Sequence, residues 1–219
     1  MALGEPLPKQ VLGHPWVLVG EDKMSKSKGN VIYADELANR FGVDAVRYYL
    51  LSEIPFTQDG TITYESFITK FNADLANTLG NLVNRTVAMT NKYFDGTVTA
   101  VQANEPLDAE LADCAKKTIE KYISLMDDYR NADACDCIMN FAKRCNKYID
   151  ETTPWVLAKD EATLPRLNAV LYNLLESIRL IGIMLTPIIP SSCKNIAAQL
   201  NCDNQELKFG VCDKFIVGE

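Results

Sequence analysis

The chain has 219 residues, 47% of them hydrophobic, and a formal net charge of −7, so its length allows one large or two small domains. These fractions are ordinary for a soluble globular chain, and we expect no apolar run long enough to span a bilayer. The acidic balance argues against broad binding of nucleic acid but allows a local basic site. The N-terminus lacks the layout of a signal peptide, so a cytoplasmic location is expected.

Seven cysteines and a single histidine, His14, bear on metal and redox chemistry. The cysteines form no Cys-x-x-Cys pair, so neither zinc nor any other protein-bound metal is predicted. An odd number of cysteines in a chain without a signal peptide favours reduced thiols. Cys114, Cys135 and Cys145 fall within helical patterns, and we expect them to be small buried apolar groups.

The first sixty residues predict a loop, a short strand and two short helices. Residues 16–19 are β-prone and should form the strand. Residues 34–52 predict two helices separated at Gly42, the second of them mostly buried. A turn at residues 59–60 leads into an extended segment at 61–63.

From Thr63 onward the pattern is helical. Apolar residues recur every three or four positions as far as Phe94, which predicts one long helix whose inward face includes Phe71. Further helices are predicted over residues 107–130, with Tyr129 inward, and over 133–150, 164–185 and 188–200. Together they form an up-and-down bundle of four long helices and one or two shorter ones, so the chain is predicted to be mainly α. The tail from Leu207 is short and mixed and stays unassigned.

A cationic stretch lies between the predicted strand and the first helix. It holds three lysines within six positions, together with two serines and Gly29. A lysine ammonium suits phosphate oxygens, and serine hydroxyls and backbone N–H groups can bind the same anion. Composition alone does not separate this interpretation from a solvated surface loop. The string Lys23-Met24-Ser25-Lys26-Ser27, however, resembles the signature loop of class I aminoacyl-tRNA synthetases.

Three residues of the helical region form a second candidate site. Asn81 and Arg85 are four positions apart, so their side chains share one helix face, away from the apolar stripe. An amide and a guanidinium can bind a base edge, and Trp155 at a helix-to-loop junction can stack on an unpaired base. Spacing alone equally allows a solvated polar face and a tryptophan that packs against the core.

Two longer segments, residues 72–96 and 148–159, resemble the anticodon-binding region of methionyl-tRNA synthetases. In that family the residues matching Asn81 and Arg85 read the anticodon, and the one matching Trp155 stacks on a base. The resemblance extends from about residue 6 to 200. It implies that residues 1–62 are the end of a Rossmann-type catalytic domain, with the signature loop and stem-contact helices, and that residues 63–219 are the anticodon-binding bundle.

The resemblance also implies an activity and its partners. The parent enzyme would use ATP, accompanied by Mg²⁺, to activate methionine and transfer it to tRNA(Met). Lys26 is the candidate for stabilising the charge that builds on the ATP phosphates, while Lys23, Met24, Ser25 and Ser27 complete the ATP-binding loop. The 219 residues lack the His-x-Gly-His element of such enzymes, so we expect a fragment that is inactive alone. The alternatives are the same half of a cysteine, leucine, isoleucine or valine enzyme, or a non-catalytic tRNA-binding module.

Overall fold

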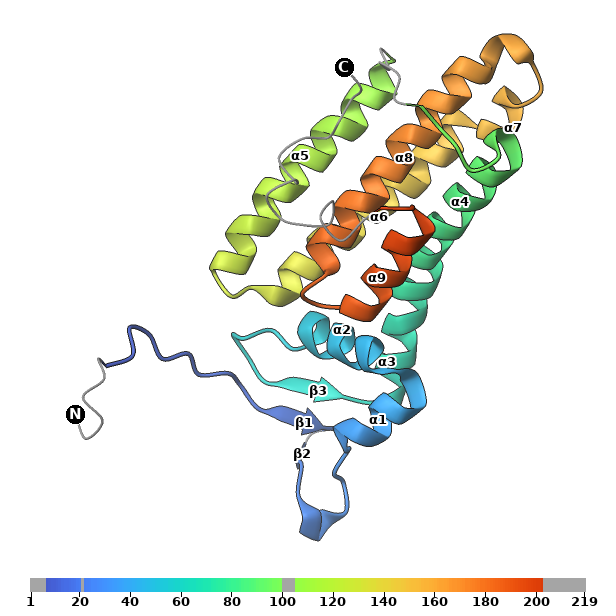
Figure 1. The fold of residues 1–219 in the computed structure, drawn as a ribbon. Helices are drawn as coiled ribbons and strands as arrows, with labels where there is room; N and C mark the ends of the chain where they lie inside the picture. The colour runs from blue at the N-terminus through green and yellow to red at the C-terminus, as the bar shows by residue number, and fades with distance from the viewer. Residues whose placement is uncertain (1–6, 21, 100–104, 203–219) are drawn as a thin grey trace.

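A computed structural model describes residues 7–20, 22–99 and 105–202 (Figure 1). The tail from Leu207, which includes Cys212, and residues 100–104 lie outside the described residues. Within the described part, a small sheet with two short helices lies at one end of a bundle of long helices. The prediction of a mainly α chain is confirmed.

The small unit at the end of the bundle is a three-stranded sheet with a helical crossover. Strand β1 (Val17–Val19) lies between β2 (Asp22–Lys23) and β3 (Gly60–Ile62). It pairs antiparallel with β2, with Leu18 opposite Lys23, and parallel with β3, with Leu18 opposite Thr61. Parallel strands need a crossover connection, and α1 (Ala34–Phe41) and α2 (Val43–Glu53) lie within this one. The predicted strand, extended segment and two helices are therefore confirmed.

The long helix predicted from Thr63 to Phe94 is helical throughout, but its winding changes twice. It consists of α3 (Tyr64–Lys70), a π-helical segment η2 (Phe71–Gly80) and α4 (Asn81–Phe94). A π turn closes i→i+5 hydrogen bonds, so it takes in more residues than an α turn, and a spacing of three to four loses register. Phe67, Leu79 and Leu82 are buried, but Phe71 is 37% exposed. The placement of Phe71 on the inward face was therefore wrong.

The remaining helices complete the bundle. They are α5 (Pro106–Asp127), α6 (Asn131–Thr152), α7 (Pro154–Leu157), a 3₁₀ turn η3 (Glu161–Thr163), α8 (Leu164–Leu185) and α9 (Pro190–Gln199). Tyr129 lies beyond the end of α5 with a positive φ of 59° and is 43% exposed, so its predicted inward position was wrong. The four long members, α4, α5, α6 and α8, confirm the predicted bundle (Figure 1).

Helix α8 is the central member, because it contacts α4, α5, α6, α7 and α9. The segment from Glu161 to Leu185, with a mean hydropathy of 1.3, is long and apolar enough to cross a membrane by composition alone. This corrects the expectation that no such run exists. Because 89% of its most apolar window is buried inside the bundle, its apolar character is that of a core helix.

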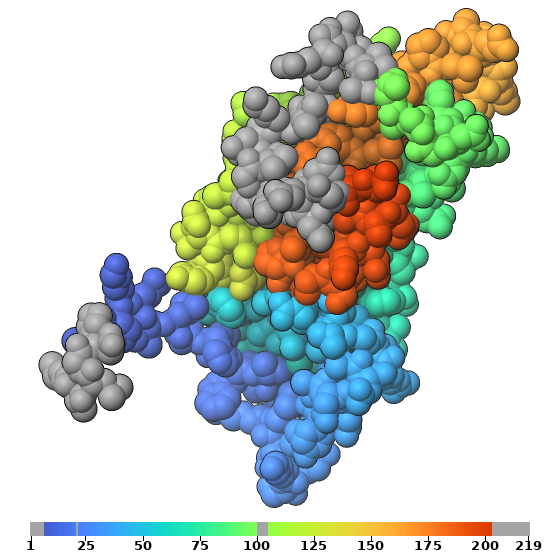
Figure 2. Space-filling model, viewed as in Figure 1, coloured from blue at the N-terminus to red at the C-terminus, as the bar shows by residue number. Residues whose placement is uncertain are grey.

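Helix α2 joins two hydrophobic cores. Val46 and Tyr49 face a small core beneath the sheet, whereas Tyr48 faces the bundle. The Tyr48 hydroxyl donates a hydrogen bond to Asp74 Oδ2 at 2.7 Å. Arg47 reaches the turn between α8 and α9, where its guanidinium donates to the carbonyls of Pro187 at 2.7 Å and Ile188 at 2.9 Å. These contacts fix the small unit against the bundle (Figure 2).

An ion cluster around Lys70 lies at the same junction. The Lys70 ammonium is 3.0 Å from Glu53, 3.2 Å from Asp74 and 3.5 Å from Asp136, so it links α2, the π-helical segment and α6. Burial disfavours the charged ammonium, but the hydrogen bond to Glu53 and the attraction of Asp74 outweigh it, so the pKa of Lys70 is raised.

Candidate functional sites

The cationic loop is a closed turn that its own side chains brace. Residues Lys26–Lys28 form a 3₁₀ turn, η1, that ends at Gly29 with a φ of 65°. The backbone N–H of Ser25 donates to Asn30 Oδ1 at 2.8 Å, and Asn30 Nδ2 donates to the Lys23 carbonyl at 3.3 Å. One amide thus joins both arms of the loop. The role of Asn30 was not predicted from the sequence, because only the fold shows that it faces Lys23 and Ser25.

The three lysines of the loop differ in their interaction partners. Lys28 forms an ion pair of 2.9 Å with Asp22, and the Lys23 ammonium lies 4.7 Å from the centre of the Trp16 ring. The exposed Lys26 has no charge or ring partner within the described part of the chain. An unpaired ammonium at the tip of a turn is available to an anionic ligand.

The other predicted residues of the loop are arranged around Lys26. The hydroxyl oxygens of Ser25 and Ser27 are 2.7 Å apart, and Met24 packs on the small hydrophobic core. The loop protrudes from the end of the molecule opposite the bundle (Figure 2). The structure therefore brings all five predicted loop residues together, with Met24 as the apolar anchor rather than a polar contact.

Asn81 and Arg85 lie side by side on the first two turns of α4, and both face α6. Asn81 Nδ2 donates to Asn146 Oδ1 at 3.4 Å, and the Arg85 guanidinium donates to Asp150 Oδ1 at 2.9 Å. Both pairs are separated by 65 residues, so α4 and α6 run in the same direction. Asn81 is exposed and the Arg85 side chain is 30% exposed, so both can be reached from solvent.

Trp155 lies at the corner that follows the same end of α6. Thr153 takes a left-handed conformation with a φ of 44°, and Pro154 begins the short helix α7. Trp155 is five positions after Asp150, the residue that pairs with Arg85, so only the end of α6 and the corner lie between them. The Trp155 side chain is 43% exposed and belongs to neither hydrophobic core. An exposed ring held at a rigid corner can stack on an unpaired base.

Comparison with known proteins gives a consistent assignment. Residues 1–87 match the family described as tRNA synthetases class I (M), and residues 108–210 match the anticodon-binding domain of tRNA ligase. The chain is 53% identical over 201 residues to a methionine–tRNA ligase of Clostridium perfringens and 54% identical over 203 residues to that of Clostridium acetobutylicum. The chain belongs to the methionyl-tRNA synthetase family.

These relatives are longer than the chain. The alignments cover 92% of this chain but 31% of the C. perfringens ligase, so the chain spans about a third of the curated relatives it matches. A Mycobacterium tuberculosis methionyl-tRNA synthetase solved with methionyl-adenylate superposes with a TM-score of 0.91 at 34% identity, over 95% of this chain and 42% of that one. An apo structure of that enzyme gives 0.79 at 34% identity, over 83% and 37%. The resemblance that the sequence showed is therefore confirmed.

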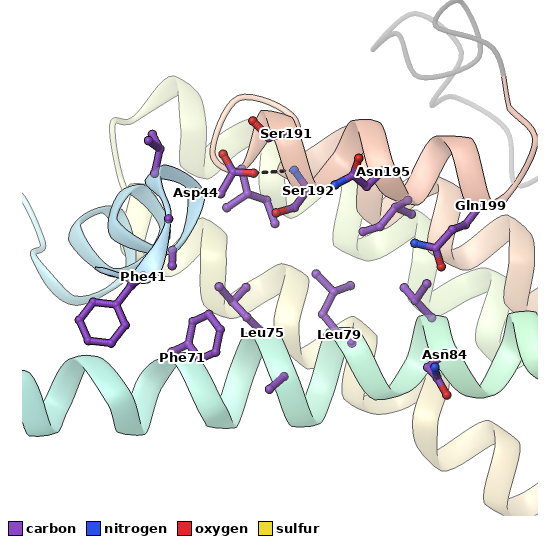
Figure 3. Close-up of a pocket in the computed structure, with 18 residues that line it drawn as sticks. Phe41, Asp44, Phe71, Leu75, Leu79, Asn84, Ser191, Ser192, Asn195 and Gln199 are labelled. Carbon is purple, nitrogen blue, oxygen red and sulfur yellow. Dashed lines mark hydrogen bonds between the residues drawn. The ribbon is translucent and has the colours of Figure 1, made fainter. Parts of the chain in front are cut away.

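A cleft of about 680 Å³ separates α9 from the π-helical segment and the start of α4 (Figure 3). Leu75 and Leu79 point into it, and Asp44 closes one end by accepting a hydrogen bond of 2.5 Å from the backbone of Ser192. Asn84, on the same helix as Asn81, lines this cleft. Asn84 therefore borders the cleft, whereas Asn81 contacts α6.

The cysteines of the bundle are reduced thiols that differ in burial. Within the described residues, no group of three or more His, Cys, Asp or Glu side chains could hold a metal ion. The Cys135 and Cys145 thiols are buried, and burial raises the pKa of each to about 12. Both were predicted to be buried apolar groups, and this is confirmed. Cys114 is only partly buried, so the same prediction for it was wrong.

Proposed function

We propose that this chain supplies the ATP-phosphate loop and the anticodon-binding surface of a cytoplasmic methionine–tRNA ligase. That enzyme joins L-methionine to tRNA(Met) and converts ATP to AMP and diphosphate. The observation that carries the proposal is the position of Asn81 and Arg85. They lie side by side on one accessible face, beside the corner that exposes Trp155.

The loop supports the first half of the proposal. As methionyl-adenylate forms, negative charge builds on the diphosphate that leaves. A preorganised ammonium at that point stabilises the charge more in the transition state than in the ground state. Lys26 is free for this task, while Asn30, Ser25 and Ser27 hold the turn that presents it. Lys23 lies on the same loop and adds a second positive charge.

Magnesium accompanies ATP in such reactions, but the residues that the structure describes offer no ligand set for it. The only carboxylate of the loop that the structure describes, Asp22, is paired with Lys28. The residues present therefore do not fit a protein-bound Mg²⁺, and any metal would be carried by the nucleotide phosphates. The 219 residues contain one histidine and no His-x-Gly-His element, so we propose that the chain alone binds RNA without forming methionyl-tRNA.

The helical site supports the second half. Arg85 uses one nitrogen on Asp150 and keeps its other donors for RNA. The exposed Trp155 ring offers a stacking surface to an unpaired base. Because the pair between Arg85 and Asp150 is largely exposed, separating it on RNA binding costs little.

Fluorescence anisotropy with a short RNA hairpin that carries the CAU anticodon tests the proposal. Replacing Trp155 with alanine should weaken binding by about tenfold or more, because base stacking contributes ~1–3 kcal/mol, whereas Trp155→Phe should retain most of the affinity. Trp16→Ala is the matched control, since Trp16 is the other tryptophan and is 64% exposed on the small sheet. Its replacement should leave hairpin binding unchanged.

Hairpins with other anticodons separate the alternatives. A preference for CAU supports the methionine enzyme, whereas a preference for a cysteine, leucine, isoleucine or valine anticodon would assign the chain to a sister enzyme. Equal binding to every hairpin, with no effect of Trp155→Ala, would refute the proposed anticodon surface.

A further inference from the structure

Asn146 on α6 connects the end of the π-helical segment with Asn81. The backbone N–H of Asn81 is shared between the carbonyls of Ala76 and Thr78, which marks the return from π-helical to α-helical winding. Asn146 Nδ2 donates to that Thr78 carbonyl at 3.0 Å and to the Ala142 carbonyl of its own helix at 3.2 Å. The irregular turn before the anticodon site is therefore fastened by one side chain of α6.

These contacts determine which way the Asn146 amide faces. Both of its N–H groups are engaged by backbone carbonyls, so only its oxygen is left for Asn81. The reversed amide would place its oxygen against two carbonyl oxygens. Asn146 can therefore act toward Asn81 only as an acceptor, and Asn81 must turn its own nitrogen toward α6.

The orientation of Asn81 then decides what it offers to a ligand. Its Nδ2 is directed to Asn146, and its Oδ1 has no hydrogen-bond partner among the residues that the structure describes. The 3.4 Å separation is long for an N–H···O bond, so Asn146 biases the amide without immobilising it. An exposed acceptor suits a base that presents an amino group, namely adenine or cytosine, but not one that presents a carbonyl oxygen there.

We propose that Asn146 is a positioning residue that orients Asn81 to select an amino-bearing base over a keto-bearing base at one position of the anticodon. The inference rests on the proposed function and adds a discriminating residue to it. A freely rotating Asn81 amide would accept either kind of base, because reversing the amide exchanges its donor and acceptor.

The test uses the whole 219-residue chain and three RNA hairpins, with the anticodons CAU, UAU and CGU. Each changed hairpin replaces one amino-bearing base with a keto-bearing base. The wild-type chain should bind one of the changed hairpins about tenfold more weakly than CAU. The ratio of the two affinities is therefore about ten for the wild-type chain. Asn146→Ala should reduce this ratio to about two, chiefly by strengthening the binding of the hairpin with the keto-bearing base.

Adding Asn81→Asp to Asn146→Ala separates positioning from simple support of the fold. A carboxylate at position 81 presents only acceptors whichever way it turns, so it needs no positioning residue. The double variant should recover the wild-type preference for the amino-bearing base, even if its added charge lowers the affinity for all three RNAs equally. Asn84→Ala is the control on the same helix, since Asn84 borders the cleft whereas Asn81 contacts α6. It should leave the ratio unchanged. Circular dichroism confirms that each variant is folded.

The outcomes are distinct. If the wild-type chain binds all hairpins equally, the proposed function itself fails. If it discriminates but Asn146→Ala keeps the ratio of affinities, or if the double variant Asn146→Ala with Asn81→Asp loses that ratio as fully as Asn146→Ala alone, the positioning role is overturned.

Discussion

Replacing Lys70 with methionine removes the cation that joins three elements at the junction while keeping most of the side-chain length. The side chain of Asp74 is only 8% exposed, and it would lose a cation 3.2 Å away. Breaking a buried ion pair costs about 3–5 kcal/mol when one charge is left behind. The remaining hydrogen bond from Tyr48 and the 18% exposure of Lys70 both reduce that cost. We expect a loss of about 2–3 kcal/mol in the free energy of unfolding.

Urea unfolding followed by circular dichroism measures this loss, and a thermal scan should show a midpoint lowered by about 5–10 °C. Lys117→Met is the matched control. Lys117 pairs with Asp113 at 2.6 Å with the same four-residue spacing, but both side chains are more than half exposed. It should leave the midpoint unchanged, because exposed pairs contribute little.

The pH dependence follows from the raised pKa of Lys70. A cation whose pKa is higher in the folded state contributes its full stabilisation below the unfolded pKa and loses it only as pH rises through the folded value. The difference between wild type and Lys70→Met should therefore be the same at pH 7 and pH 9. Adding Asp74→Asn to Lys70→Met should recover part of the loss, since the carboxylates then left without Lys70, Glu53 and Asp136, are 37% and 62% exposed rather than buried. A Lys70→Met chain as stable as wild type, or a double variant whose losses simply add, would refute this reasoning.

Two further predictions concern the loop and the thiols. In a full-length ligase that carries this segment, Lys26→Ala should slow methionine-dependent exchange of pyrophosphate into ATP by about a hundredfold or more while methionine binding persists, as expected when a preorganised charge is lost; an unchanged exchange rate would contradict the role of Lys26. At pH 8 a thiol reagent should label the partly buried Cys114 well before Cys135 and Cys145, because burial raises the pKa of the latter two to about 12. Peptide mapping by mass spectrometry measures the order, and equally fast labelling of all three would show that the bundle opens readily.

Much of the fold could be predicted because local patterns control it. Apolar spacing placed the long helices, and Pro106, Pro154 and Pro190 stand at the first position of α5, α7 and α9, where a proline is tolerated. The π-helical segment was not predicted, because apolar residues spaced by three and four positions do not distinguish an α-helix from one that contains a wider π turn.

The candidate sites were predictable only in part. The signature loop could be predicted because its residues are contiguous in the sequence, and all five predicted residues, Lys23 to Ser27, lie together in the structure. The helical site depends on partners far away in the chain, since Asn146 and Asp150 each lie 65 residues from the side chain they contact. No short-range pattern pairs Asn81 with Asn146, because the packing of α4 against α6 is a property of the assembled bundle.

The parallel arrangement of α4 and α6 has a consequence for folding. Neither helix alone contains the RNA-binding surface that we propose, because Asn81 and Arg85 lie on α4 whereas Trp155 follows α6. An unfolded chain therefore lacks that surface, so an RNA that binds the folded bundle stabilises it, and a higher RNA concentration stabilises it further. Under this proposal, binding of a cognate hairpin would also report that the long helices have assembled.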